Sequence, residues 1–463
     1  MDMKLRLSEA AALLGVPFSG PDAEVLRVST DSRSIRAGDL FIALRGEKFD
    51  GGAFAAKALQ QGAVGVVLDT AQAPDIPSAI RVDDTRLALG RLAAAWRRRF
   101  AIPVVAITGS NGKTTVKEML AAILQVKAGV ADAVLATEGN LNNDIGVPLM
   151  LLRLRDTHQF AVLEMGMNHA GEIDYLTRLA RPDVALVNNA LTAHIGNLGS
   201  VEAIARAKGE IFNGLTDAGI AVFNADDEHV GLWREANAHR SIIDFSLRHP
   251  SVVRGHFRPS LFGSVLTLML PDAECEVNLQ VPGEHNVMNA LAATAAAFAL
   301  DVSHHSIVAG LSGFGGIKGR LQKKTGLHGA TFLDDTYNAN PDSVKAALAV
   351  LAQQTGRKVL VLGDMGELGA DAVAMHAQIG LAARDAGIDR LLALGDLSRE
   401  TVGAFGAGAM HFERIQELLA ELENELTADT TVLVKGSRFM QMERVVQSFM
   451  EYPPAMPAGN EEH

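Results

Sequence analysis

The 463-residue sequence contains a single cysteine, Cys275. One thiol cannot form a disulfide within the chain, and it cannot make a Cys-x-x-Cys metal or redox site. Long apolar runs are also missing, since the richest, 289–300, is shorter than the roughly 18 residues that a membrane helix needs. The N-terminal segment lacks the basic region followed by an apolar run that marks a signal peptide. These absences predict a cytoplasmic protein in a reducing compartment, without membrane insertion.

The chain has fewer basic than acidic residues: 42 Lys and Arg against 54 Asp and Glu, which gives a net charge of −12. Phosphate backbones attract basic surfaces, so an acidic chain is a poor candidate for binding nucleic acid. A local basic pocket for a small phosphorylated ligand remains compatible with this balance. Hydrophobic residues make up 48% of the chain, and its length suggests roughly three domains with full cores. We expect a monomer.

The pattern of apolar segments divides the chain into three parts and predicts an α/β fold. Residues 1–100 mix short apolar runs with turn-rich segments, which is typical of a small mixed α/β domain. In 101–314, apolar strands alternate with helices, which predicts a central parallel sheet. A similar alternation in 315–452 follows a glycine-rich hinge and predicts a doubly wound, Rossmann-like C-terminal domain. The polar tail 453–463 is expected to be disordered.

The sharpest motif is T-G-S-N-G-K-T-T at 108–115, which lies between an apolar strand and a helix. Glycines let backbone N–H groups wrap an anion at a helix N-terminus. Lys113 would then neutralise the β- and γ-phosphates of ATP, and the Thr114 hydroxyl would reach Mg²⁺. The motif departs from the general pattern at Ile107, where the first glycine belongs. The predicted ATP-binding residues in this loop are Gly109, Ser110, Asn111, Gly112, Lys113, Thr114 and Thr115.

This motif resembles that of the Mur ligase superfamily, the ATP-dependent amide-forming enzymes of peptidoglycan synthesis. The resemblance continues through D-S-R at 31–33, G-N-L-N-N at 139–143, E-M-G at 164–166, A-K-G-E at 207–210, G-E-H-N at 283–286 and G-R at 319–320. Three later segments resemble the family members that use D-alanyl-D-alanine: D-D-T-Y-N-A-N-P-D-S at 334–343, G-D-M-G-E-L-G at 363–369 and V-K-G-S-R at 434–438. The D-N-P-R motif usual in the sister ligase that adds the third amino acid is missing.

The resemblance implies ATP, two Mg²⁺ ions and a lysine modified by CO₂. Glu164 ends an apolar strand beside the phosphate loop and is expected to bind Mg²⁺, with helix capping as the alternative. By resemblance, His194 is a ligand of the second Mg²⁺, and Lys208 carries a carbamate that requires a neutral amine. From the sequence alone, a lone histidine is more often structural than a metal ligand. Lys208 by itself would be interpreted as a solvent-exposed lysine on an amphipathic helix. The expected catalytic residues are Lys113, Glu164, His194, Lys208 and Arg320, and the expected metal ligands are Thr114, Glu164, His194 and Lys208.

Further roles follow from the same resemblance. Asn289 is expected to contact ATP, and Arg320 to reach the γ-phosphate across the cleft. Asp335 is expected to hold the ribose, with Asp334 as the alternative. Polar residues are expected to bind the uridine diphosphate, the sugar and peptide, and the dipeptide. For each of these residues the alternative is that it is polar only because it lies in a surface loop. The expected substrate-binding residues are Ser29, Thr30, Asp31, Ser32, Arg33, Gly46, Thr137, Asn142, Asn143, Asn338, Asn340, Asp364, Lys435 and Ser437.

The expected reaction joins D-alanyl-D-alanine to UDP-N-acetylmuramoyl-tripeptide through an acyl phosphate. Three alternatives remain: a sister Mur ligase, a folylpolyglutamate synthase, and a non-catalytic nucleotide-binding protein with a decayed ligase fold. The N-A-N-P-D-S segment and the region around Asp31 argue against the folate enzyme. A non-catalytic protein is disfavoured because all of the expected catalytic and nucleotide-binding positions considered are retained: Lys113, Glu164, Lys208, Arg320 and Asp335.

Overall fold

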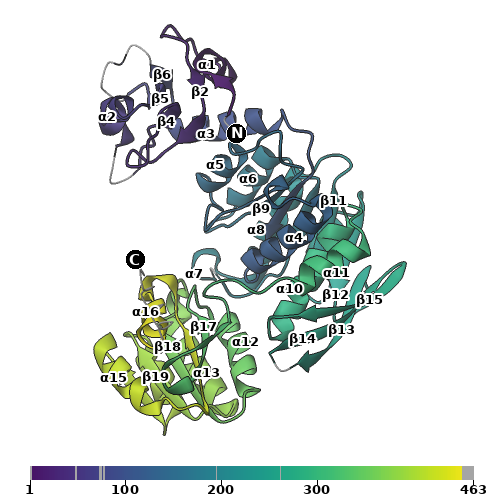
Figure 1. Cartoon of the computed structure of the whole chain (residues 1–463), viewed down its shortest axis with the longest axis vertical. Helices are drawn as coiled ribbons and strands as arrows, with labels where there is room; N and C mark the ends of the chain where they lie inside the picture. The colour runs from purple at the N-terminus through teal and green to yellow at the C-terminus, as the bar shows by residue number, and fades with distance from the viewer. Residues whose placement is uncertain are drawn as a thin grey trace, which may run out of the picture.

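The computed structural model of the chain describes residues 3–46, 50–71, 76, 79–193, 195–260 and 262–450. The expected metal ligand His194 and the expected tail at 453–463 lie outside these residues. Within the described part, three main sheets of four, nine and six strands follow one another along the chain. Figure 1 shows them as a purple N-terminal unit, a teal central unit and a green-to-yellow C-terminal unit. The predicted α/β fold with three domains is confirmed.

The N-terminal domain combines a small parallel sheet, of order β3-β4-β5-β6, with short helices and a two-stranded ribbon. Its elements are β1 (Leu5–Arg6), α1 (Leu7–Leu14), β2 (Glu24–Val25), β3 (Arg27–Ser29), β4 (Asp39–Ile42), α2 (Ala55–Gln60), β5 (Gly65–Asp69), β6 (Ala79–Val82) and α3 (Thr85–Arg97). Helix α3 begins where the Asp84 carboxylate accepts hydrogen bonds from the N–H groups of Arg86 and Leu87. It then packs against the central domain, to which it leads.

The central domain carries the nine-stranded sheet, of order β15-β14-β13-β12-β11-β10-β7-β9-β8. The strands from β8 to β13 are parallel, whereas β14 and β15 extend the sheet as an antiparallel pair. The strands are β7 (Val104–Thr108), β8 (Val134–Ala136), β9 (Phe160–Glu164), β10 (Val184–Val187), β11 (Ile220–Asn224), β12 (Ile242–Ser246), β13 (Val253–Ser260), β14 (Gly263–Leu270) and β15 (Ala273–Leu279). The helices are α4 (Lys113–Ala128), α5 (Gly146–Leu151), α6 (Glu172–Ala180), α7 (Ile195–Leu198), α8 (Val201–Gly209), α9 (Val230–Ala236), α10 (Glu284–Phe298) and α11 (His304–Ser312).

Both faces of this sheet are covered, which explains why its parallel strands are apolar without alternation. Successive side chains of a strand point to opposite faces. Val104 and Ala106 therefore join the core formed with α5, α6 and α8. Val105 and Ile107 join the core formed with α4, α10 and α11. The polar groups of the site are left at the carboxyl ends of β7, β9 and β10, where ligands bind in open α/β sheets.

The C-terminal domain has a six-stranded sheet of order β16-β17-β21-β18-β19-β20, parallel except for the edge strand β16. Its strands are β16 (Gln322–Thr325), β17 (Thr331–Asp335), β18 (Arg357–Gly363), β19 (Arg390–Leu394), β20 (Ala409–Phe412) and β21 (Thr430–Lys435). Its helices are α12 (Pro341–Ala352), α13 (Ala372–Asp385), α14 (Ser398–Phe405), α15 (Ile415–Glu425) and α16 (Glu443–Ser448). Among the described residues, no helix combines the length and the apolar character that crossing a membrane requires.

Candidate functional site

The phosphate loop connects β7 to α4 and is held in shape by the loop after β10. The N–H of Asn111 donates to Asn189 Oδ1 at 2.9 Å, and Asn188 Nδ2 donates to the Asn111 carbonyl at 3.0 Å. Gly112 has a φ of 80°, and a Cβ there would lie 2.2 Å from Asn289 Oδ1. Glycine is therefore required at 112 both for its backbone conformation and for the close approach of α10.

Lys113 starts α4 and points back over the loop, where its Nζ donates to the Gly109 carbonyl at 2.7 Å. Burial lowers the pKa of this ammonium, the nearby Glu164 carboxylate opposes that shift, and the Arg320 charge adds to it. The loop thus presents its N–H groups and one cation to the same space at the N-terminus of α4. This is the arrangement that binds a polyphosphate.

Two oxygen groups that could bind a metal, the Thr114 hydroxyl and the Glu164 carboxylate, lie side by side at the start of α4. Thr114 Oγ1 donates to Glu164 Oε2 at 2.9 Å, and Asn142 Nδ2 donates to Glu164 Oε1 at 2.9 Å. Within the described ranges, no group of three or more His, Cys, Asp and Glu side chains could hold a metal by itself. A hydroxyl and one carboxylate beside a phosphate loop nevertheless fit Mg²⁺, which is commonly held by one or two carboxylates together with substrate phosphates and water.

Lys208 lies near the end of α8 and is only 1% exposed. Its Nζ has no hydrogen bond or ion pair with any residue that the structure describes. Burial, and then the positive charge of Lys113, lower the pKa of this lysine well below its ordinary value. The side chain that sequence alone presents as a solvated helix residue is therefore a buried amine, and its burial shifts it toward the neutral form relative to a free lysine.

The C-terminal domain brings Arg320 and Asp335 to the phosphate loop. Arg320 Nη2 donates to Thr114 Oγ1 at 2.9 Å, and its guanidinium lies 4.3 Å from the centre of the Tyr337 ring. Asp335 Oδ2 accepts from Lys435 Nζ at 2.6 Å. The alternative ribose ligand, Asp334, is 3% exposed and pairs with Lys324 and Thr336. Of the two carboxylates, Asp335 is the one that lines the cleft.

A second group of contacts joins the two domains through α12. Asn340 Nδ2 donates to Asn111 Oδ1 at 2.8 Å, and the Asn340 carboxamide also caps α12. Asp342 Oδ2 accepts from the N–H of Thr192 at 3.0 Å, in the loop after β10. The N-A-N-P-D-S segment thus bonds to the phosphate loop as well as facing the cleft.

The cleft between the central and C-terminal domains has a volume of about 850 Å³. It brings together most of the expected site residues of these domains: Ser110, Asn111, Gly112, Lys113, Thr114, Thr115, Asn142, Asn143, Glu164, Asn289, Arg320, Asp335, Asn338, Asn340, Lys435 and Ser437. Gly109, Thr137, Lys208 and Asp364 are not among the lining residues. Thr137 is 1% exposed and accepts from the N–H of Glu164, and Asp364 accepts three hydrogen bonds at the start of α14.

The expected uridine-diphosphate residues 29–33 begin at the last residue of β3 in the N-terminal domain and lie outside the lining of this cleft. Asp31 accepts from the N–H and the guanidinium of Arg33 at 2.9–3.0 Å. These hydrogen bonds hold the pKa of the Asp31 carboxyl at about 2. The segment is therefore a well-formed turn that carries paired charges.

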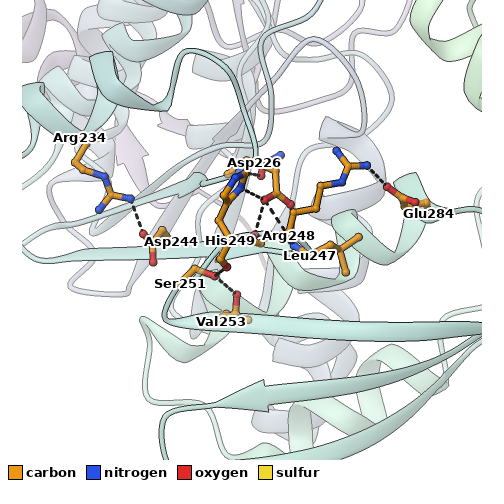
Figure 2. Close-up of polar contacts among 11 residues, drawn as sticks. Asp226, Arg234, Asp244, Leu247, Arg248, His249, Ser251, Val253 and Glu284 are labelled. Atoms are coloured by element: carbon orange, nitrogen blue, oxygen red, sulfur yellow. Dashed lines mark hydrogen bonds and ion pairs between the residues drawn. The ribbon is translucent and has the colours of Figure 1, made fainter.

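A second cavity, of about 780 Å³, adjoins the cleft between α12 and the ends of β11 and β12. Figure 2 shows the polar contacts at its edge. Asp226 accepts from the N–H of Leu247 and lies 2.8 Å from His249 Nδ1, while Arg248 pairs with Glu284 at 2.6 Å. These groups satisfy one another within the protein, near His285, which lines both cavities.

Sequence reasoning missed three residues of this site. Asn188 and Asn189 hold the phosphate loop, and Lys117 is buried on α4 behind it. A pair of asparagines directly after an apolar parallel strand is a signal that could have found the first two. No local pattern distinguishes Lys117 from an exposed helix lysine.

His285 makes stability depend on pH. Burial lowers the pKa of its imidazole to about 4, the charge of Asp335 opposes the shift, and that of Lys435 adds to it. Below about pH 6.5 the unfolded chain binds a proton that the folded protein refuses, so the free energy of unfolding falls as the pH falls from about 6.5 to 4. We expect a loss of at most about 1.4 kcal/mol per pH unit from this group.

Urea titrations of the free energy of unfolding should show a flatter pH profile for His285→Gln. The control His305→Gln, on the exposed side of α11, should keep the profile of the original protein. Equal slopes in both variants would contradict the assignment.

Comparisons with known proteins agree with this geometry. Residues 107–297 match the description "Mur ligase middle domain", 319–438 match "Mur ligase, glutamate ligase domain", and 24–97 match "Mur ligase family, catalytic domain". The UDP-N-acetylmuramoyl-tripeptide–D-alanyl-D-alanine ligase of Escherichia coli is 42% identical over 97% of this chain and 99% of its own length.

Two solved structures have the same architecture. MurF from Acinetobacter baumannii has a TM-score of 0.91 and 38% identity, and the match covers 96% of this chain and 99% of that one. A MurF ligase from Thermotoga maritima in complex with ADP has a TM-score of 0.81 and 26% identity, over 91% and 96% of the two chains.

Proposed function

The chain belongs to the Mur ligase family, and on that premise we propose that it joins D-alanyl-D-alanine to UDP-N-acetylmuramoyl-tripeptide with hydrolysis of ATP. The observation that supports this most is a single cleft that presents the phosphate loop, Glu164 and Arg320 beside Asp335 and Lys435 of the C-terminal domain. Such a cleft can hold a nucleotide and two further reactants together, which removes most of the entropic cost of their encounter.

The proposed reaction has two chemical steps. The terminal carboxylate of the tripeptide attacks the γ-phosphorus of ATP, which forms an acyl phosphate and releases ADP. The amine of D-alanyl-D-alanine then attacks the acyl carbon, loses a proton and expels phosphate, which leaves an amide. Lys113 and Arg320 are the fixed cations for the charge that develops on the transferred group. Closure of the cleft would keep water from the acyl phosphate.

Thr114 and Glu164 would hold Mg²⁺ together with the ATP phosphates, and the metal would neutralise phosphate charge. The finer proposal is that Lys208 carries a carbamate as a further anionic ligand. Its support is a buried amine without a hydrogen-bond partner among the described residues, because carbamylation requires the neutral form and replaces a cation by two oxygens. His194 lies outside the described residues and stays, by resemblance, the expected ligand of a second Mg²⁺.

The remaining roles are proposals of the same kind. Asn289 and Asp335 would hold the adenosine part of ATP, and Ser29, Thr30, Asp31, Ser32, Arg33 and Gly46 would bind the uridine diphosphate. The sugar and peptide would meet Asn142, Asn143 and the buried Thr137. Lys435, Ser437 and Asp364 are proposed dipeptide residues, although Asp364 would act only through α14. Asn338 and Asn340 are proposed to bind substrate in the same domain. A cytoplasmic location and a monomeric state complete the proposal.

An ADP-release assay tests the proposed function. With purified UDP-N-acetylmuramoyl-tripeptide, we expect release to depend on D-alanyl-D-alanine and to be negligible with meso-diaminopimelate, L-lysine or D-glutamate. The reason is that acyl phosphate formation and its capture need both reactants in one closed site. Mass measurement of the product should show a pentapeptide nucleotide.

Each alternative has its own outcome. Turnover with a single amino acid and a shorter UDP-linked precursor would make the protein a sister ligase. Release with a folate and glutamate would favour the folylpolyglutamate synthase. Binding of ATP without ADP release in any mixture would favour a non-catalytic protein.

A further inference from the structure

Lys117 is a buried cation that the proposed chemistry does not use. It lies one turn after Lys113 on α4 and is 2% exposed. Its Nζ donates to the Thr137 carbonyl at 2.6 Å and pairs with Glu118 Oε1 at 2.5 Å. Lysine is almost never buried to this degree, because removing an ammonium from water is costly unless strong partners replace the water. A methionine would fill a similar space without that cost.

The partner of Lys117 is itself bonded to the strand that ends at Glu164. Thr137 follows β8, and its N–H donates to the Val162 carbonyl at 3.0 Å. Its Oγ1 accepts from the N–H of Glu164 at 2.9 Å. The ammonium therefore fixes a residue that is joined twice to β9, once directly at the position of the carboxylate.

Two groups of the cleft depend on Thr137 for their position. One is Glu164, whose carboxylate accepts from Thr114 and Asn142. The other is the loop 138–143, which begins directly after Thr137 and carries Asn142 and Asn143 into the cleft. The chain of contacts runs from a buried charge, through one carbonyl and one hydroxyl, to the backbone N–H of Glu164, the proposed Mg²⁺ ligand.

We propose that Lys117 is a positioning residue for the metal-binding carboxylate. It touches neither substrate nor metal, and it holds Thr137 so that Glu164 and Asn142 keep one arrangement. The inference rests on the proposed function, because it assigns Glu164 to Mg²⁺. Residues that orient a ligand in this way typically contribute about 10- to 100-fold to metal affinity or activity. The charge on Lys117 strengthens its bond to the Thr137 carbonyl beyond that of a neutral donor.

The test replaces Lys117 by methionine and compares it with Lys127→Met, an exposed lysine in the last turn of the same helix. Calorimetric titration with ADP alone should give affinities within about twofold of the original protein, since the phosphate loop is unchanged. In the presence of Mg²⁺, ADP affinity of Lys117→Met should fall about 10-fold. In the ligase assay, kcat per folded molecule should fall about 10- to 100-fold, and the Mg²⁺ concentration for half-maximal rate should rise. Lys127→Met should match the original protein.

A purely structural lysine predicts something else: a lower melting temperature with unchanged kcat per folded molecule and unchanged Mg²⁺ dependence. That result would overturn the proposal. If Lys117→Met does not fold, Thr137→Val removes the next link while keeping the lysine, and it should give the same loss of Mg²⁺-dependent affinity. Original Mg²⁺ dependence in folded Thr137→Val would also overturn it. The titrations use only ADP and Mg²⁺, so they remain decisive even if D-alanyl-D-alanine proves not to be the acceptor, which would refute the proposed function alone.

Discussion

Lys113→Ala is expected to lower kcat for ADP release by about 10³-fold or more while the protein stays folded. Removing a single donor to developing charge in an active site costs about 10²- to 10³-fold, and this donor also carries a full charge. Among the described residues, its Nζ donates only to the Gly109 carbonyl, and Lys113 belongs to none of the hydrophobic cores. Burial lowers the pKa of the ammonium, so the fold itself gains little from this charge.

The measurement is kcat at saturating ATP, together with a thermal melt by circular dichroism. Lys127→Ala, on the exposed end of the same helix, is the matched control and should retain full activity. A folded Lys113→Ala protein with near-original kcat would remove the phosphate loop from the mechanism.

Lys208→Ala is expected to lose about 10²-fold or more of its activity and to regain part of it when acetate or formate is added. If the lysine carries a carbamate, the reaction of its amine with CO₂ releases a proton and leaves an anionic group with two oxygens. Alanine deletes that group, and a small carboxylate can enter the vacated volume and supply the oxygens to Mg²⁺. A lysine that acts as a cation would instead be replaced by methylammonium.

Arg206→Ala provides the control, because Arg206 lies on the same helix and is exposed, where it pairs with Glu202. It should neither lose activity nor respond to carboxylates. Rescue of Lys208→Ala by methylammonium alone, or full activity without any additive, would exclude the carbamate.

The phosphate loop could be found from sequence because its chemistry is local. The loop is defined by contiguous residues, an apolar strand before it and a helix after it, and β7 and α4 lie where that pattern predicts. The alternation of apolar strands with helices likewise predicted the parallel sheets. The antiparallel pair β14 and β15, which widens the central sheet, extends that architecture.

Properties that depend on tertiary packing could not be predicted from the sequence. Sequence alone does not distinguish Lys208 and Lys117 from exposed helix lysines, yet both are nearly fully buried. Their burial comes from packing against distant segments, such as Thr137 against Lys117. Whether Asp334 or Asp335 lines the cleft depends on which face of β17 meets it, and alternation along a strand leaves that open until the neighbouring strands are placed.

The contact between Asn111 and Asn340 joins positions separated by 229 residues in the chain. A protein synthesised from its N-terminus completes the central sheet well before residue 340 leaves the ribosome, since domains fold largely in the order of their synthesis. The unfinished chain then has a phosphate loop without its amide partner, and without Arg320 and Asp335 to face it. Under the proposed function, consumption of ATP therefore begins only once translation has supplied the third domain, and incomplete chains do not waste the nucleotide.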